Sequence, residues 1–169
     1  MIVMPATVVS WQLLEDHLTR HLAENGKPDF FMVPQTIEDV TATFDPTEWH
    51  RDYQRAWVLL DDDNQVRGHA VVTRNAVAPH RCTLGMGVEE PFRFQGHGKR
   101  LMTAALEWAD ARGFDWVDGQ ALAHNEPVLG LDKWAGFIHC GQLDDVARAE
   151  ADGHVLTFDL IILTRKRPT

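Results

Sequence analysis

The sequence predicts an α/β fold with a mixed, mostly antiparallel central sheet and helices on both faces. Three observations predict it: a hairpin-like pair of apolar runs near residue 60, two helical patterns that alternate with strands after it, and two more apolar strands near the end. Helices that alternate with strands only after a hairpin indicate both antiparallel and parallel pairs. The 169 residues suffice for one buried core, so we expect a single domain over residues 1–169.

Apolar residues recur at helical spacing near the N-terminus, over residues 10–25. Ser10 is placed to cap this helix and Gly26 to end it. The next segment, residues 26–55, contains three prolines and scattered aromatic residues without a sustained period. We therefore expect loops there, with one short helix near residues 37–43.

Two apolar runs, residues 56–60 and 66–73, flank the turn-rich stretch DDDNQ and predict an antiparallel hairpin. The stretch RCTLGMGV at residues 81–88 predicts the next strand. Its glycines, Gly85 and Gly87, would weaken an ordinary strand. They indicate a bulge or a place where another group lies close to the backbone.

Helices and strands alternate in the second half of the chain. An amphipathic pattern predicts a helix over residues 98–112, which Gly113 ends. The stretch FDWVDGQAL at residues 114–122 predicts a strand, and a short helix is expected between Pro127 and Gly136. Two final strands are expected over residues 137–147 and 154–163, joined by the turn AEADG.

The composition disfavours several classes of protein. The net charge of −9 argues against nucleic-acid binding, which depends on clustered Lys and Arg. An acidic surface would suit an amine substrate, although solubility alone also explains it. No apolar run approaches the roughly 20 residues of a membrane span. Only Cys82 and Cys140 are present, and the N-terminus lacks a secretory pattern, so we expect a cytoplasmic protein.

A glycine-containing loop precedes the helix predicted at residue 98. Arg93, Gly96 and Gly98 form the pattern R-x-x-G-x-G between a strand and that helix. The free N–H groups of a first helical turn can hold a pyrophosphate, and glycine lets the backbone approach the anion. Lys99 and Arg100 would add positive charge. A plain strand-to-helix turn is the alternative, and neither the dinucleotide fingerprint nor the Walker pattern is present.

The run VEEPFRFQGHGKRL, residues 88–101, together with NEPVLGLDKWAGF, residues 125–137, resembles the acyl-CoA signature of the Gcn5-related N-acetyltransferase (GNAT) family. The resemblance is specific over residues 81–137 and only topological over residues 1–75. It implies a V-shaped splay between the fourth and fifth strands, the latter over residues 115–123. It also implies acetyl-CoA as the co-substrate.

The resemblance implies a set of cofactor-binding residues. The backbone amides of residues 94–99 would hold the CoA pyrophosphate, and the backbone of Met86 and Val88 would pair with the pantetheine arm. Asn125 matches a position that contacts the cofactor and also suits a helix N-cap. The implied set is Met86, Val88, Arg93, Phe94, Gln95, Gly96, His97, Gly98, Lys99 and Asn125.

The family reaction is the direct attack of an amine on the thioester in a ternary complex, and it needs an oxyanion donor, a base and an acid. The resemblance implies the N–H of Val88 as the oxyanion donor. The family's usual tyrosine acid is replaced by Asp132, which can serve only if burial raises its pKa enough to keep it protonated.

The general base stays open, because the glutamate that relatives carry before Val88 is absent. Glu90 and His124 are the candidates to test, and Asp118 is a further option. In a structural role, Glu89 and Glu90 would be solvated loop charges, and His124 would be a packed strand end.

Other reactive side chains are expected to play structural roles. Cys82 and Cys140 lack a neighbouring base and are predicted to be small buried hydrophobes. His17 and His21 lie four residues apart on one helix, but no third ligand accompanies them, so no metal site is expected.

The leading interpretation is an acetyl-CoA-dependent N-acetyltransferase acting on a primary amine in a small molecule, a peptide N-terminus or a lysine. Phe30, Phe31 and Trp49 are candidates to line the acceptor pocket. The alternative is a non-catalytic acyl-CoA-binding sensor or regulatory module. A third interpretation is an amine-conjugating detoxification enzyme with a longer acyl donor. No nucleic-acid or membrane partner is expected, and a homodimer is left open.

Overall fold

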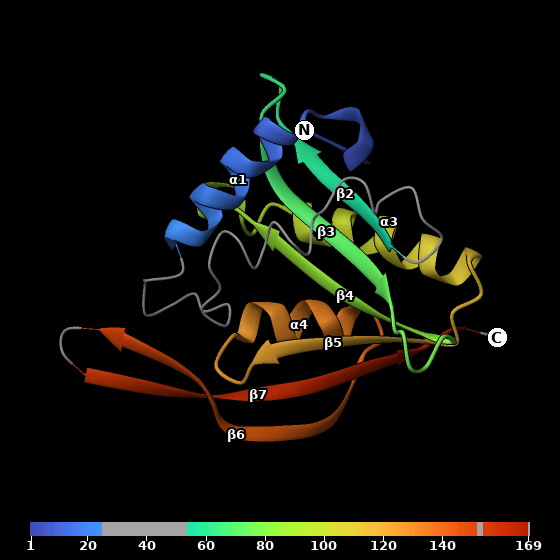
Figure 1. Ribbon diagram of the computed structural model, residues 1–169, viewed down its shortest axis with the longest axis vertical. Coiled ribbons are helices and arrows are strands. Elements are labelled where there is room, and N and C mark those ends of the chain that lie inside the picture. The colour runs from blue at the N-terminus through green and yellow to red at the C-terminus, as the bar shows by residue number, and fades with distance from the viewer. Residues whose placement is uncertain (25–53, 152–153, 169) are drawn as a thin grey trace.

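The centre of the molecule is a seven-stranded sheet with the strand order β1-β2-β3-β4-β5-β7-β6 (Figure 1). The computed structural model describes residues 1–24, 54–151 and 154–168. Neighbouring strands are antiparallel except for β4 and β5, which run parallel. The predicted mixed, mostly antiparallel sheet is confirmed.

The strands and helices lie close to their predicted ranges. The strands are β1 (Ile2–Pro5), β2 (Gln54–Leu60), β3 (Val66–Arg74), β4 (Arg81–Val88), β5 (Trp116–Leu122), β6 (Ile138–Ala151) and β7 (His154–Lys166). The helices are α1 (Trp11–Glu24), α3 (His97–Ala111) and α4 (Glu126–Trp134), with 3-10 turns at Ala6–Val8 and Glu90–Phe92. Within these ranges, none of the helices has the length and apolar character of a membrane span.

One observed strand was not predicted, and one predicted helix falls on residues that the structure does not describe. The strand β1 is missing from the prediction, because four residues are too few to show an alternating pattern. The helix predicted near residues 37–43, and the aromatic residues Phe30, Phe31 and Trp49, lie outside the described residues.

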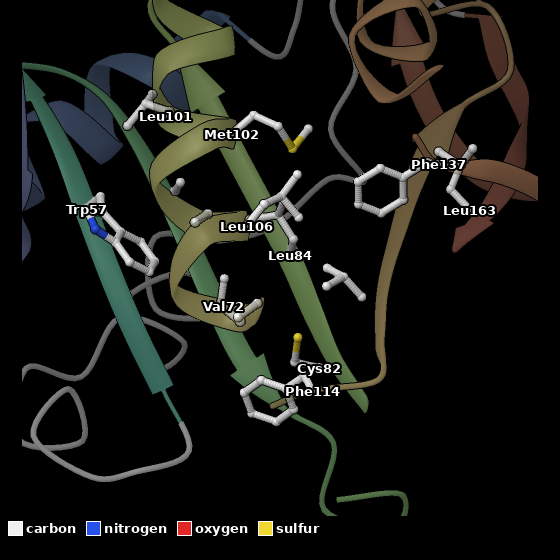
Figure 2. Packing of buried hydrophobic residues seen from close by; sticks show 14 of the residues in the cluster. Trp57, Val72, Cys82, Leu84, Leu101, Met102, Leu106, Phe114, Phe137 and Leu163 are labelled. Atoms are coloured by element: carbon white, nitrogen blue, oxygen red, sulfur yellow. The ribbon is translucent and has the colours of Figure 1, made fainter. Parts of the chain in front are cut away.

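Helices cover both faces of the sheet, as predicted. On one face, Leu14 and Leu18 of α1 pack with Val58 of β2 in the smaller of two apolar clusters. On the other face, Leu101 of α3 packs with Leu59 of β2 in a larger cluster that reaches β4, β5 and β7 (Figure 2). Successive residues of β2 thus point to opposite faces, as the alternation along a strand requires.

The two cysteines lie in different environments. Cys82 is fully buried in the larger cluster (Figure 2), and burial raises the pKa of its thiol to about 12. It is the small buried hydrophobe that the sequence predicts. Cys140 is exposed, so the same prediction is wrong for it. The reason is that β6 is the last strand of the sheet and leaves side chains open to solvent.

The parallel strands β4 and β5 part soon after they meet (Figure 1). Their pairing ends with Thr83 opposite Asp118, although β4 continues to Val88 and β5 to Leu122. The strand β3 stays paired with β4 as far as Val88, so only the β5 side of β4 opens. This is the V-shaped splay expected between the fourth and fifth strands.

A polar network closes the narrow end of this V. Arg81 donates two hydrogen bonds to the carboxylate of Asp118, from Nε and from Nη2. Thr164 Oγ1 donates a third to the same carboxylate, at 2.8 Å. Burial acts to raise the pKa of Asp118, but the bonds from Arg81 and Thr164 outweigh it and leave the pKa below its ordinary value. A carboxylate held in this way, away from the open end, does not support the use of Asp118 as the base.

Candidate functional site

A cavity of about 410 Å³ occupies the open side of the V. Its wall includes eight of the ten predicted cofactor-binding residues: Met86, Val88, Arg93, Phe94, Gly96, Gly98, Lys99 and Asn125. Five more of the described residues, which the sequence analysis did not place there, also line it: His21, Gly87, Pro127, Val128 and Leu131. The predicted residues Gln95 and His97 belong to the same loop but do not line the cavity.

The loop before α3 presents free main-chain donors to this cavity. Gly96 has a φ of 81°, a left-handed conformation that favours glycine, and a Cβ there would meet nothing within 4 Å. The first amide of α3 bonded to the loop is that of Arg100, which donates to Gly96 O at 3.2 Å. Within the described chain, the amides of residues 94–99 donate to no acceptor. The site therefore has the donors that an anion at a helix N-terminus needs.

The side chains of this loop turn away from its amides. Phe94 is 83% exposed and also has a positive φ, of 59°. Gln95 Nε2 donates to the carbonyl of Pro91 at 3.0 Å, and the Lys99 ammonium lies 4.8 Å from the centre of the Trp134 ring. The backbone at the centre of the loop is thus left uncovered by its own side chains.

The strand β4 directs main-chain groups into the cavity. The N–H of Glu89 donates to Arg67 O on β3 at 2.9 Å. Successive residues of an antiparallel strand direct these groups to alternate sides, so those of Val88 and Met86 face the side that β5 has left. Arg93 Nε reaches Val88 O from this side, at 2.7 Å. The N–H of Val88 is placed to act as a donor in the cleft.

A buried cluster of ionisable groups lies behind the cleft and corrects the prediction for Glu89. Glu89 is only 4% exposed, because α1 and β3 cover it. Its carboxylate accepts hydrogen bonds from His17 Nδ1 at 2.8 Å, Arg20 Nε at 3.0 Å and Arg67 Nη1 at 3.3 Å. Burial acts to raise its pKa, but these partners, His17 first, hold the pKa below its ordinary value. Glu89 is not the solvated loop charge that was expected.

A third histidine, His69 of β3, joins the pair on α1. His17 Nε2 and His69 Nδ1 lie 2.9 Å apart and share a hydrogen bond. His17 and His21 share a helix, as the sequence analysis expects, and His69 is a neighbour that it did not identify. These nitrogens face one another instead of a common point, and the described residues contain no group of side chains suited to a metal ion.

Gly87 allows the histidine rings to lie against β4. A Cβ on Gly87 would lie 2.4 Å from His21 Nε2 and 3.0 Å from His69 Cε1. A Cβ on Gly85, by contrast, would meet no atom of the described residues within 4 Å. The glycines were expected to admit a close neighbour, and the neighbour of Gly87 is a pair of imidazole rings.

The three predicted acid and base residues do not line the cavity. Glu90 and His124 are exposed, and His124 is therefore not the packed strand end that was expected, because it lies in the turn after β5. Asp132 is only 8% exposed, and burial raises its pKa from 3.8 to about 6. The shift has the direction that an acid needs, but a pKa of about 6 keeps Asp132 protonated only below about pH 6, so the condition set for it, a carboxyl that stays protonated, is not met at neutral pH.

Replacement of Asp132 by asparagine should stabilise the protein at neutral pH. Between pH 3.8 and about 6 the folded protein keeps a proton on Asp132 that the unfolded chain releases, so the free energy of unfolding falls as the pH rises through this window. Above it the difference amounts to about 3 kcal/mol. Urea unfolding should show Asp132→Asn to be more stable than the wild type at pH 7 and similar to it at pH 4. Equal stabilities at pH 7 would contradict the raised pKa.

Asn125 caps α4, as its position suggests. Its side-chain oxygen accepts from the N–H of Val128 at 3.3 Å, and Pro127 follows within the first turn. The residue also lines the cavity, so the two expected roles are compatible.

Comparisons with known proteins place this geometry in a family. The model of the Acetyltransferase (GNAT) family matches residues 21–137. A phosphinothricin acetyltransferase of the GNAT superfamily from Sinorhizobium meliloti, solved with acetyl-CoA, has 18% identity and a TM-score of 0.78, over 98% of this chain and 88% of that one. No curated protein sequence matches significantly.

Two further solved structures share the fold. A ribosomal-protein-alanine N-acetyltransferase from Brucella melitensis has 19% identity and a TM-score of 0.77, over 98% of this chain and 99% of that one. An N-acetyltransferase from Staphylococcus aureus has 20% identity and a TM-score of 0.78, over 99% of this chain and 98% of that one. The family match covers more than half of the sequence, including the splayed strands and the glycine loop, and this chain belongs to the GNAT acetyltransferase family.

Proposed function

We propose that this protein transfers an acetyl group from acetyl-CoA to a primary amine in a small molecule, a peptide N-terminus or a lysine. The single observation that carries the proposal is the run of amides over residues 94–99, at the mouth of the cleft, that donate to no acceptor among the described residues. Family membership supports acetyl-CoA as the donor, and the neighbouring structures support an amine as the acceptor.

The residues present fit acetyl-CoA. The amides around Gly96 would hold its pyrophosphate, and the strand edge at Met86 and Val88 would take its extended arm as an added strand. Asn125, which also lines the cavity, would contact the bound cofactor. When bound, acetyl-CoA supplies a thioester whose carbonyl carbon an amine can attack.

The chain itself supplies polar groups for this chemistry. The N–H of Val88 faces the cleft and would donate to an oxygen that gains negative charge. The carbonyl of Val88 is occupied by Arg93, which fixes the strand end in place. Asp132, whose pKa burial raises to about 6, remains the proposed proton donor in its protonated form, although it does not itself line the cavity.

Calorimetry with acetyl-CoA tests the proposal directly. We expect saturable binding to the full chain below about 1 mM, the upper end of the usual range for enzyme substrates. An amine panel should then include phosphinothricin, a peptide with an N-terminal alanine, and spermidine, which are named for neighbouring structures. Release of CoA thiol measures turnover. The absence of binding at millimolar acetyl-CoA would refute the proposal.

A non-catalytic acyl-CoA sensor is the second candidate. One observation favours it: the predicted residues Glu90 and His124 are exposed and do not line the cavity. Binding without amine-dependent release of thiol would support the sensor, and any amine-dependent release rejects it. Donors of increasing chain length in the same assay distinguish acetyl transfer from conjugation with a longer acyl group.

A further inference from the structure

Three histidine rings meet at the wall of the cleft beside the end of β4. His21 lines the cavity next to Gly87. The ring of His17 stacks on it at 20° with centroids 5.8 Å apart, and the ring of His69 meets it edge-on at 82° and 5.5 Å. The ring of His21 is thus held between two other rings and the bare backbone of Gly87.

The hydrogen bonds fix which ring nitrogens carry protons. A carboxylate can only accept, so the contact of 2.8 Å with Glu89 requires a proton on His17 Nδ1. In neutral His17 the other nitrogen, Nε2, is an acceptor, and His69 Nδ1 must therefore donate to it across 2.9 Å. In both hydrogen bonds, from His69 to His17 and from His17 to Glu89, the donated proton points toward Glu89. The negative charge of Glu89 therefore orients both of the rings that hold His21.

Among the described residues, the ionisable groups of the cluster around His21 come from three parts of the fold. They are His17 and Arg20 of α1, His69 and Arg67 of β3, and Glu89 and Arg93 of the segment between β4 and α3. Burial lowers the pKa of His21 to about 4, the charge of Arg93 acts in the same direction, as does that of His17 when its ring is protonated, and Glu89 opposes them. At neutral pH the ring is uncharged and able to accept a proton.

We propose that His21 is the general base of this protein and that Glu89, His17 and His69 are its positioning residues. This inference rests on the proposed acetyl transfer. The N–H bond of the attacking amine breaks while a bond forms between its proton and His21 Nε2, and the electron pair stays on the amine nitrogen. The carboxylate of Glu89 stabilises the resulting imidazolium, and the proton then leaves His21 for solvent.

Removal of the imidazole tests the catalytic role of His21. Once the wild type turns over an amine from the panel, His21→Ala should lower kcat by about 100-fold, a usual contribution of a general base, with the KM for acetyl-CoA changed less than about twofold. Added imidazoles should restore turnover in proportion to their neutral fraction and increasingly with their basicity. His80→Ala, at an exposed histidine far from the cluster in sequence, is the control and should keep wild-type kcat.

A variant His21→Ala with wild-type kcat, or one that no imidazole rescues, overturns the inference but leaves the proposed function intact. If the wild type itself releases no thiol with any amine, the proposed function fails instead. His21→Gln, which keeps a polar side chain of similar length, serves as the second variant if the alanine variant does not fold.

Histidine NMR of the full chain gives a readout that does not depend on turnover. Acetyl-CoA should shift the ring signals of His21 and leave those of His80 in place. In Glu89→Gln the ring signals of His17 should shift, because Nδ1 loses the carboxylate that accepts its hydrogen bond at 2.8 Å. Unchanged His21 signals on saturation with acetyl-CoA would show that the cluster does not face the cofactor. Unchanged His17 signals in Glu89→Gln would show that the cluster does not depend on Glu89, and either result overturns the inference.

Discussion

Replacement of Gly96 and Gly98 together by leucine is expected to abolish acetyl-CoA binding while the protein stays folded. The amides of residues 94–99 are free in the described chain, and two large side chains would cover them. At Gly96 the φ of 81° also disfavours any L-residue, so the loop would move. At Gly98 a Cβ would lie 3.3 Å from Leu131 Cδ2, the flexible end of a side chain on the opposite wall. The effect should be a loss of affinity beyond about 100-fold.

Calorimetry with acetyl-CoA and circular dichroism measure the two halves of this prediction. The loop lies at the surface, where Gly96 has open space around it, so the core should be little affected. Gly130→Leu is a matched control: this glycine lies on α4 outside the cavity wall, and a Cβ there meets nothing within 4 Å. The control should bind like the wild type. Wild-type affinity in the double variant would mean that the anion is held elsewhere.

The sequence predicted this loop because its determinants are contiguous. The glycines and the start of α3 lie within a few residues of one another, so a free helix N-terminus can be inferred without tertiary information. The sheet was predictable for a related reason, since the apolar runs of β2 and β3 flank one short turn. A pattern of neighbouring residues is enough to predict an element whose contacts are made between residues close in sequence.

The cluster behind the cleft could not be predicted in this way. Glu89 follows β4 in an acidic pair that looks solvated, but α1, 72 residues earlier, helps to bury it and brings His17 against it. His69 lies within an apolar strand, and nothing near it in sequence indicates a partner on α1. The spacing of His17 and His21 was the one available signal, and it shows a shared helix face without showing which strand that face meets.

The second large effect is expected for Gly87→Ala, because this change displaces the histidines without removing them. The new Cβ would lie 2.4 Å from His21 Nε2 and 3.0 Å from His69 Cε1, distances that the rings must relieve by moving. Such overpacking should lower the free energy of unfolding by about 1–3 kcal/mol. If His21 is the base, a displacement of about 1 Å should also lower kcat by about 100-fold.

Gly85→Ala separates this effect from the general cost of a side chain on β4. Gly85 lies two residues earlier on the same face of the strand, and a Cβ there meets no atom within 4 Å in the described part of the chain. Its free energy of unfolding should stay within about 1 kcal/mol of the wild type, since an alanine in a strand replaces a glycine without a clash. Urea unfolding and kcat measured on both variants complete the comparison. Equal kcat values in the two variants would mean that the position of the rings over Gly87 is irrelevant to turnover, whatever the change in stability.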